Sequence, residues 1–126
     1  MDKIIFVALG GGAGAVARYL LGAASLRHLG TAWPYGTFVA NVSGGLAMGL
    51  LVAWLAHRGV ADQERMRLFL GVGLLGGFTT FSAFSLEVAL MIERRELALA
   101  AAYASASVLM SVGALFAGML LMRRFV

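Results

Sequence analysis

The sequence predicts an all-α membrane protein, built as a single four-helix transmembrane domain over residues 1–126. Hydrophobic residues make up 61% of the chain and charged residues only 13%. A spanning helix needs roughly 20 mostly apolar residues, and four stretches qualify, at residues 4–26, 36–56, 68–92 and 97–122. Their apolar runs are continuous rather than alternating, which predicts helices and not a transmembrane barrel. Most of the charge lies in the connections, such as "HRGVADQERMR" and "ERRE".

Composition excludes several classes of function. The chain has no cysteine, so disulfides and thiolate metal sites are ruled out. A net charge of +4 is typical of arginines at the ends of membrane helices, and we expect no nucleic-acid partner. The first span resembles a signal peptide, because Lys3 precedes an apolar run. More membrane segments follow it, so we expect it to remain uncleaved.

The first span carries small residues at a packing interval. Gly10 and Gly14 are four residues apart, a spacing that lets two membrane helices approach closely. In the same stretch Gly10, Gly12 and Ala15 fit a dinucleotide-binding pattern, but no acidic residue follows until Asp62 and no strand is expected. We therefore interpret these glycines as packing residues. The later spans repeat the spacing at Gly45 and Gly49, Gly73 and Gly77, and Ala114 and Gly118.

Two polar residues interrupt the apolar character of the first two spans. Arg18 lies well inside the first span, where an ionisable residue suggests function by default. It could attract an anion into a vestibule, or its side chain could snorkel to the interface beside Tyr19. Asn41 lies early in the second span, two residues before Ser43. Its amide could donate to an anion, or could join two helices by hydrogen bonds.

The third span contains "GGFTTFSAFS", residues 76–85, which predicts a helix that is broken in the middle of the membrane. Gly76 and Gly77 should loosen the helix, and the hydroxyls that follow compete for its backbone. The freed carbonyls could bind a hard cation such as sodium. Phenylalanines at every third position, Phe78, Phe81 and Phe84, could hold a small anion at their positive ring edges. The alternative is a kinked helix with ordinary aromatic packing.

Polar side chains continue beyond this motif. Glu87 follows it and could pair with an arginine or bond a neighbouring hydroxyl, and a structural role is favoured. In the fourth span Tyr103, Ser107 and Ser111 are spaced so that they share one helical face. That stripe would suit a hydrated ion path. Alternatively, each serine could bond a carbonyl of its own helix.

The distribution of Lys and Arg gives only a weak orientation signal. With four spans, both termini and the second connection lie on the same side. That side carries Lys3, Arg58, Arg65, Arg67, Arg123 and Arg124, and the other carries Arg27, Arg94 and Arg95. The bias favours cytoplasmic termini. It is small enough to permit insertion in both orientations, hence an antiparallel dimer, although a single orientation is the alternative.

Taken together, the motifs resemble those of the Fluc (CrcB) fluoride channels. The resemblance covers essentially the whole chain. It includes the length, the four spans, the glycine-rich start that ends in "GAVARYLLG", and "GTFVANVSGG" in the second span. It also includes "GGFTTFSAFS" followed by Glu87. The last two motifs in this order are highly specific together, whereas either alone would be weak.

The resemblance implies a multi-pass protein of the bacterial inner membrane that forms an antiparallel, dual-topology homodimer. Fluoride would leave the cytoplasm passively through two narrow pores. A structural Na⁺ at the dimer centre would be held by backbone carbonyls of Gly76 and Thr79 from both subunits. The pore phenylalanines match Phe81 and Phe84, and the pore asparagine matches Asn41.

The remaining family positions are also present. Arg18 matches the arginine that follows the glycine-rich start. The polar track of the pore resembles Tyr103, Ser107 and Ser111. Thr80 and Ser82 lie beside the pore phenylalanines and are expected to donate to fluoride.

Two other functions compete with the channel. A small multidrug exporter of the four-helix, dual-topology kind relies on a glutamate in its first helix, where this chain has Arg18 and no acid. A non-transporting scaffold would explain the glycine faces, but not the aligned hydroxyls or the broken helix. No nucleophile, base and orienting group cluster along the chain, so we expect no enzyme.

Overall fold

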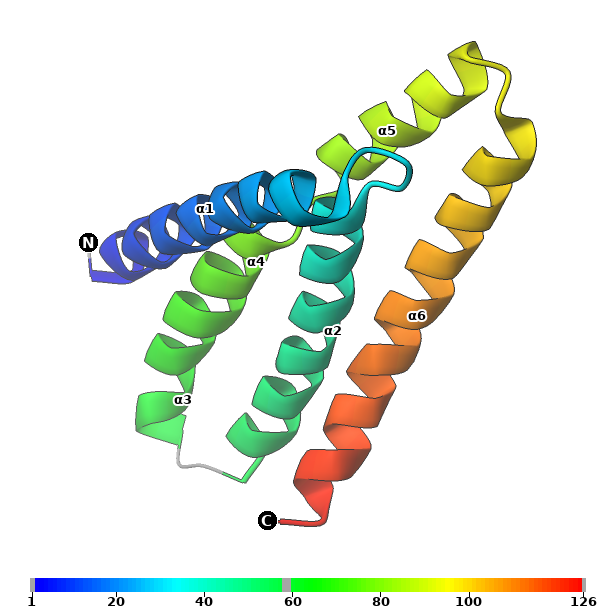
Figure 1. Cartoon of the computed structure of the whole chain (residues 1–126). Coiled ribbons are helices and arrows are strands. Elements are labelled where there is room, and N and C mark those ends of the chain that lie inside the picture. The colour runs from blue at the N-terminus through cyan, green and yellow to red at the C-terminus, as the bar shows by residue number, and fades with distance from the viewer. Residues whose placement is uncertain (1, 58–59, 126) are drawn as a thin grey trace.

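The computed structural model describes residues 2–57 and 60–125 (Figure 1). Four segments are long and apolar enough to cross a membrane: Asp2–Leu29, Tyr35–Leu55, Gln63–Glu93 and Leu97–Arg123. The described residues form helices and connections without a strand, so the prediction of four helical spans is confirmed. Arg58, which contributed to the orientation argument, lies outside the described residues.

The spans divide into seven helical elements. Three spans are single helices: α1 (Asp2–Leu29), α2 (Tyr35–Leu55) and α6 (Leu97–Arg123). The third span is made of α3 (Val60–Met66), the π-helix η1 (Arg67–Leu75), α4 (Gly76–Phe78) and α5 (Ser82–Glu93). Figure 1 shows α5 turned away from the line of α4 and running toward the start of α6.

Glycines bring the helices into backbone contact. A Cβ atom added at Gly14 would collide with the carbonyl of Leu74, because α1 packs directly on η1 and α4. A Cβ atom added at Gly49 would collide with the carbonyl of Leu115, because α2 packs on α6 in the same way. Backbone cannot rotate aside as a side chain can. The predicted role of the four-residue glycine spacing in packing is therefore confirmed.

The third span changes its backbone geometry along its length. The amide of Gly76 donates to the carbonyl of Gly71, the five-residue interval of a π-helix, which is rare and frequent at functional sites. Gly76 and Gly77 were expected to interrupt the helix, but both lie within α4. The backbone instead becomes extended at Thr79 (φ −87°, ψ 158°), and residues 79–81 separate α4 from α5.

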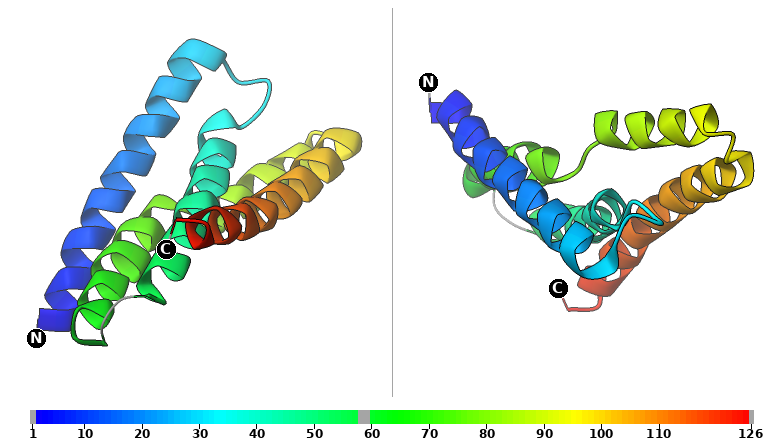
Figure 2. Two further views of the ribbon diagram at one scale, coloured as in Figure 1. Left: turned by 90° about the horizontal axis from the view of Figure 1, so that it is seen from below. Right: turned by 45° about the horizontal axis from the view of Figure 1, so that its top comes forward.

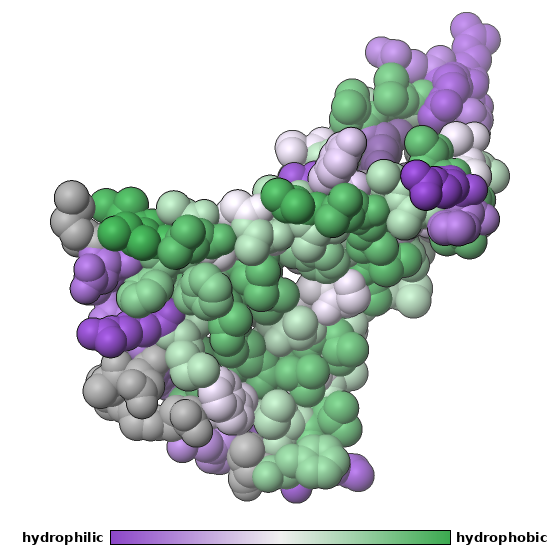
Figure 3. Space-filling model, turned by 60° about the vertical axis from the view of Figure 1, so that its left-hand side comes forward, coloured by the Kyte–Doolittle hydropathy of each residue, from purple (hydrophilic) through white to green (hydrophobic). Residues whose placement is uncertain are grey.

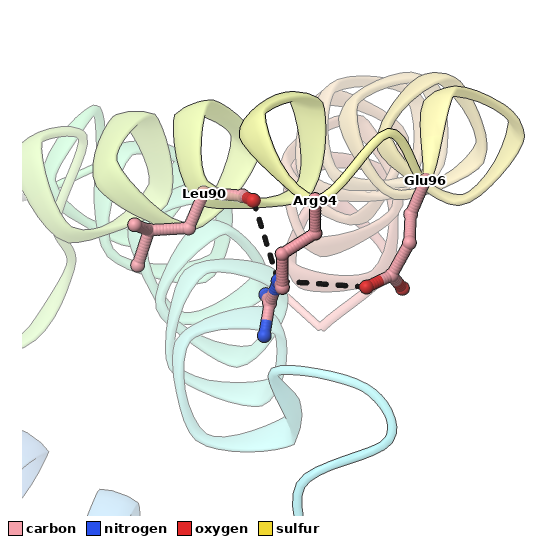
Figure 4. Close-up of polar contacts among 3 residues, drawn as sticks. All are labelled: Leu90, Arg94 and Glu96. Carbon is pink, nitrogen blue, oxygen red and sulfur yellow. Dashed lines mark hydrogen bonds and ion pairs between the residues drawn. The ribbon is translucent and has the colours of Figure 1, made fainter.

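The connection between α5 and α6 is a tight turn. Arg95 takes a positive φ of 61°, and the neighbouring Arg94 holds the turn with its Nε atom. That atom donates to the carbonyl of Leu90 at 3.3 Å and lies 3.4 Å from Oε1 of Glu96 (Figure 4). These charges mark one end of the molecule. The connection between α1 and α2 lies at the same end, because residues of both connections line one pocket.

The helices do not close into a compact bundle. α1 packs on η1 and α4, and α2 packs on α6, while α5 leaves the line of α4 and packs on the first half of α6 (Figure 2). The buried apolar cluster is small and consists of Phe84, Met91, Ala100 and Tyr103. Large apolar side chains elsewhere face outward, and hydrophilic residues gather at the extremities (Figure 3). This distribution is that of a protein surrounded by lipid.

Candidate functional site

Asn41 of α2 holds the interruption of the third span in place. Its Oδ1 atom accepts from the backbone amide of Thr80 at 2.8 Å, and its Nδ2 atom donates to the carbonyl of the same residue at 2.9 Å. In a continuous helix the Thr80 amide would bond the carbonyl of Gly76, four residues earlier. Asn41 therefore takes over hydrogen bonds that the helix gives up. One hydrogen of its amide group remains for another acceptor.

Arg18 of α1 supports the other side of the interruption. Its Nε atom donates to the carbonyl of Gly77 at 3.3 Å, close to the C-terminal end of α4. A cation near the last carbonyls of a helix stabilises that end. Arg18 is half-buried against α4, whereas Tyr19 is largely exposed. In this structure the Arg18 side chain reaches toward the break in the third span.

The hydroxyls at the interruption already have partners. Thr79 Oγ1 donates to the carbonyl of Leu75 at 2.9 Å, which closes the end of α4. Thr80 Oγ1 accepts from the amide of Ala83 at 3.2 Å, one of the free amides in the first turn of α5. It also lies 3.3 Å from Ser82 Oγ, and either hydroxyl can be the donor of that pair. The two threonine hydroxyls thus help to stop one helix and to start the next.

Two phenylalanines and a tyrosine form an aromatic row beside the interruption. The ring centroids of Phe81 and Phe84 are 5.5 Å apart, and those of Phe84 and Tyr103 are 5.3 Å apart. Phe81 is 76% exposed, whereas Phe84 is almost buried. Phe78 belongs to α4 and packs at Gly44 instead, so the break separates it from the other two rings. Phe81 thus places an aromatic ring on a free surface, where a second molecule could cover it.

Glu87 links α5 to the second and fourth spans. Its Oε2 atom accepts from the hydroxyl of Thr37 at 2.8 Å, and its Oε1 atom accepts from the hydroxyl of Tyr103 at 2.8 Å. The prediction that Glu87 bonds a neighbouring hydroxyl is confirmed, and neither bond involves an arginine. Sequence reasoning missed Thr37. No spacing rule relates it to Glu87, because the two residues lie on different helices.

The hydroxyl stripe of α6 extends along a cavity. Tyr103 is fully buried, and the Oγ atoms of Ser107 and Ser111 are buried without a hydrogen-bond partner among the described residues. Neither serine bonds a carbonyl of its own helix, unlike Ser43, which donates to Val39. A buried donor without a partner costs about 1–3 kcal/mol. Such groups call for a partner that the chain alone does not supply, such as water or an ion.

Most of the predicted site residues line this single cavity of about 540 Å³. None of its described lining residues is charged. Glu87, which accepts a hydrogen bond from Tyr103, lines a second pocket of about 520 Å³ together with Thr37. The predicted site residues that line the first cavity are Asn41, Gly76, Thr79, Thr80, Phe81, Phe84, Ser107 and Ser111. Four other predicted site residues are not among its lining residues: Arg18, Ser82, Glu87 and Tyr103.

Comparison with known proteins gives one consistent result. The family model described as "CrcB-like protein, Camphor Resistance (CrcB)" matches residues 5–119. A curated protein of Caulobacter sp. (strain K31), named "Fluoride-specific ion channel FluC", is 62% identical over 124 residues, which are 98% of this chain and 97% of the relative. A protein of the same name from Phenylobacterium zucineum (strain HLK1) is 65% identical, over 98% of each chain. Another, from Rhodospirillum centenum, is 55% identical over 123 residues.

Proposed function

The chain belongs to the CrcB-like family, and from that premise we propose that it is a fluoride-selective ion channel. As a multi-pass protein of the bacterial inner membrane it belongs to a class of transporters rather than of enzymes. One observation carries the proposal. Ser107 and Ser111 line an uncharged cavity and have buried hydroxyls without a partner among the described residues, and Phe81 and Phe84 line the same cavity.

The chemistry of this cavity suits fluoride. Fluoride is small and strongly hydrated, so a selective pore must replace its water with several donors at once. The two serine hydroxyls, the remaining N–H of Asn41 and the positive edges of the phenylalanine rings can serve as such donors. A ring of cations would attract chloride as well, and this lining has no charge. The expected pathway therefore depends on donors rather than on fixed positive charge.

A second copy of the chain would complete the pathway. Phe81, Val108 and Val112 line the cavity, yet 76%, 53% and 51% of their respective surfaces are exposed. A path that is open on one side cannot exclude lipid or larger ions. In a dimer with a twofold axis, each copy would cover the cavity of the other with the same surface, and the dimer would have two pores. The weak Lys/Arg bias of the sequence supports an antiparallel arrangement of the two copies.

A structural Na⁺ at the dimer centre fits the backbone of the interruption. The Thr80 amide is bonded to Asn41, so the Gly76 carbonyl lacks the donor that a continuous helix would provide. Carbonyl oxygens of unwound backbone are suitable ligands for Na⁺, and those of Gly76 and Thr79 would hold it. When bound, the ion would supply a positive charge that both copies share. Among the described residues no cluster of His, Cys, Asp or Glu offers another metal site.

Export through such a pore would be passive. Fluoride enters a cell as the neutral acid, dissociates there, and leaves through the channel down its own gradient. The fixed donors of the cavity need no conformational cycle to release an ion, provided that each of them binds it weakly. This mechanism differs from that of a proton-coupled exporter, which needs an acidic residue in the pathway. Glu87 is not among the lining residues of the cavity, and both of its carboxylate oxygens accept hydrogen bonds, one from Thr37 and one from Tyr103.

Current recordings in planar bilayers test the proposal. With a tenfold fluoride gradient and equal chloride on both sides, the reversal potential should lie near the fluoride equilibrium potential, about 59 mV for a monovalent ion. A reversal potential near zero would mean that chloride passes as well and would contradict selectivity. Uptake of an organic cation driven by a proton gradient would instead favour the exporter.

A further inference from the structure

A groove between α2 and the start of the third span adjoins the proposed pathway at Met48 and extends away from it along α2. It has a volume of about 580 Å³, and its α2 wall is formed by Met48, Leu51, Val52 and Leu55. At its floor the two helices meet, since a Cβ atom added at Gly71 would lie 3.5 Å from Cδ2 of Leu51. The α2 wall is wholly apolar and about 10 Å long at the 1.5 Å rise of an α-helix.

Polar groups occur at the end of the groove nearer to the chain connection. Gln63 Nε2 donates to the carbonyl of Leu55 at 2.6 Å and so satisfies a carbonyl in the last turn of α2. Glu64 lies 2.9 Å from the ammonium of Lys3, which neutralises its carboxylate. Arg67 lines the same end, and it forms no hydrogen bond or ion pair with another described residue. The groove ends at an exposed guanidinium, which shares the single carboxylate of Glu64 with Lys3.

The end of the groove near Arg67 lies at the level expected for lipid headgroups. Trp54 lies in the last turn of α2, and tryptophan is enriched where the hydrocarbon meets the polar headgroups. The apolar part of the groove extends from there toward the membrane centre. Arg65 and Arg67 stand on the same turn of the third span, so this end is positive once Lys3 and Glu64 neutralise each other. An anionic phosphate matches this charge.

We propose that this groove binds an anionic phospholipid, with an acyl chain against the α2 wall and the phosphate on Arg67. The groove accounts for both parts of such a ligand, whereas free phosphate would leave Val52, which is 45% exposed, uncovered. Arginine binds phosphate in a bidentate manner, which gives the headgroup a defined position. The inference requires only that the chain is a membrane protein. It stands whether or not the central cavity conducts fluoride.

Native mass spectrometry of the detergent-solubilised protein tests this site. The protein is incubated with phosphatidylglycerol or with phosphatidylcholine, and the lipid-bound fraction is measured. Arg67→Gln should lower phosphatidylglycerol binding about fivefold, as expected for one charge at a membrane surface. Arg124→Gln makes the same charge change in a residue that does not line the groove and should leave binding unchanged. Val52→Trp should fill the groove and reduce binding of both lipids.

Two results would overturn the proposal. Equal phosphatidylglycerol binding by Arg67→Gln and Arg124→Gln would show that the lipid responds to general surface charge. A dimer that dissociates in Val52→Trp, with lipid binding unchanged, would show that a second copy of the chain occupies the groove.

Discussion

At the scale of single residues, the proposed channel gives Asn41 two tasks, which one amide group can perform together. Its oxygen and one N–H hold the backbone of Thr80, and the second N–H is left for an ion. The two alternatives that the sequence left open, helix contact and anion donor, are therefore compatible in one side chain. Their separation requires a substitution that keeps one task and removes the other.

Asn41→Asp makes that separation in part. The carboxylate keeps the acceptor for the Thr80 amide, but it loses the N–H that donates to the Thr80 carbonyl as well as the free N–H, and it repels an anion. We expect fluoride flux through liposomes to fall about tenfold or more, as for loss of a hydrogen bond to a charged group. Asn41→Ala removes both hydrogen bonds to the Thr80 backbone as well, and it should also destabilise the fold by about 1–3 kcal/mol. Normal flux in Asn41→Asp would assign Asn41 to helix contact alone.

The phenyl rings of Phe81 and Phe84 are the second test at this scale. Phe81→Ile and Phe84→Ile keep a large apolar side chain but remove the ring edges, whose partial positive charge would attract an anion. Fluoride efflux should fall by about tenfold in each, if an edge contributes about 1 kcal/mol or more to the barrier. Phe116→Ile on the outer surface of α6 is the control. Unchanged efflux in both variants would remove the rings from the mechanism.

At the scale of elements, backbone contact between helices determines the arrangement of the site. α1 supports the end of α4 through Arg18 and packs on it through glycines, so its position affects the interruption. The two glycines Gly12 and Gly14 of α1 allow a matched comparison. A Cβ atom at Gly14 would collide with backbone of η1, whereas one at Gly12 meets nothing within 4 Å.

Gly14→Ala should therefore lower the thermal stability of the protein in detergent by about 2–3 kcal/mol, as overpacking does. Gly12→Ala should be neutral or should stabilise by about 0.5–1 kcal/mol, because alanine favours the helix. Thermal unfolding followed by circular dichroism measures both. Similar losses in the two variants would mean that the close approach of α1 and η1 is not what holds these helices together.

The elements also show how far the sequence determines the site. The four spans, the glycine contacts and the shared face of Tyr103, Ser107 and Ser111 follow from local composition and spacing. The position of the interruption does not. Gly76 and Gly77 remain helical, and the backbone changes only at Thr79, because Asn41 on another helix competes for the next amide.

Two further features depend on contacts between helices and left no local signal. Thr37 joins Glu87 across spans that are distant in sequence. The π-helical stretch from Arg67 to Leu75 consists of apolar residues, Arg67 and two glycines, a composition that an ordinary α-helix can also have. Arg18 was recognised as unusual from its position alone, but its partner Gly77 became clear only from the fold.

At the scale of the whole molecule, a single copy of the chain leaves the candidate site uncovered. Its cavity is open on the side of Phe81, and large apolar residues face outward along α6. In the proposed dimer, an ion shared by both copies would couple their association to the sodium concentration. Binding to the folded dimer alone stabilises it by mass action.

We expect the dimer in detergent to melt at a higher temperature in sodium chloride than in the chloride salt of N-methylglucamine. At a sodium concentration one hundred times the Kd, the gain should be about 2.7 kcal/mol. Scanning calorimetry at constant ionic strength measures it, with potassium as the control for ion size. Equal melting temperatures in all three salts would rule out the sodium assignment.

Anion efflux from liposomes that contain the purified dimer tests the central claim, that donors in an uncharged cavity conduct fluoride selectively. A fluoride electrode and a chloride electrode record release from matched vesicles. The account predicts rapid release of fluoride with little release of chloride, and a fluoride release about tenfold slower in Phe84→Ile. Comparable release of both anions, or no release from correctly assembled dimers, would contradict it.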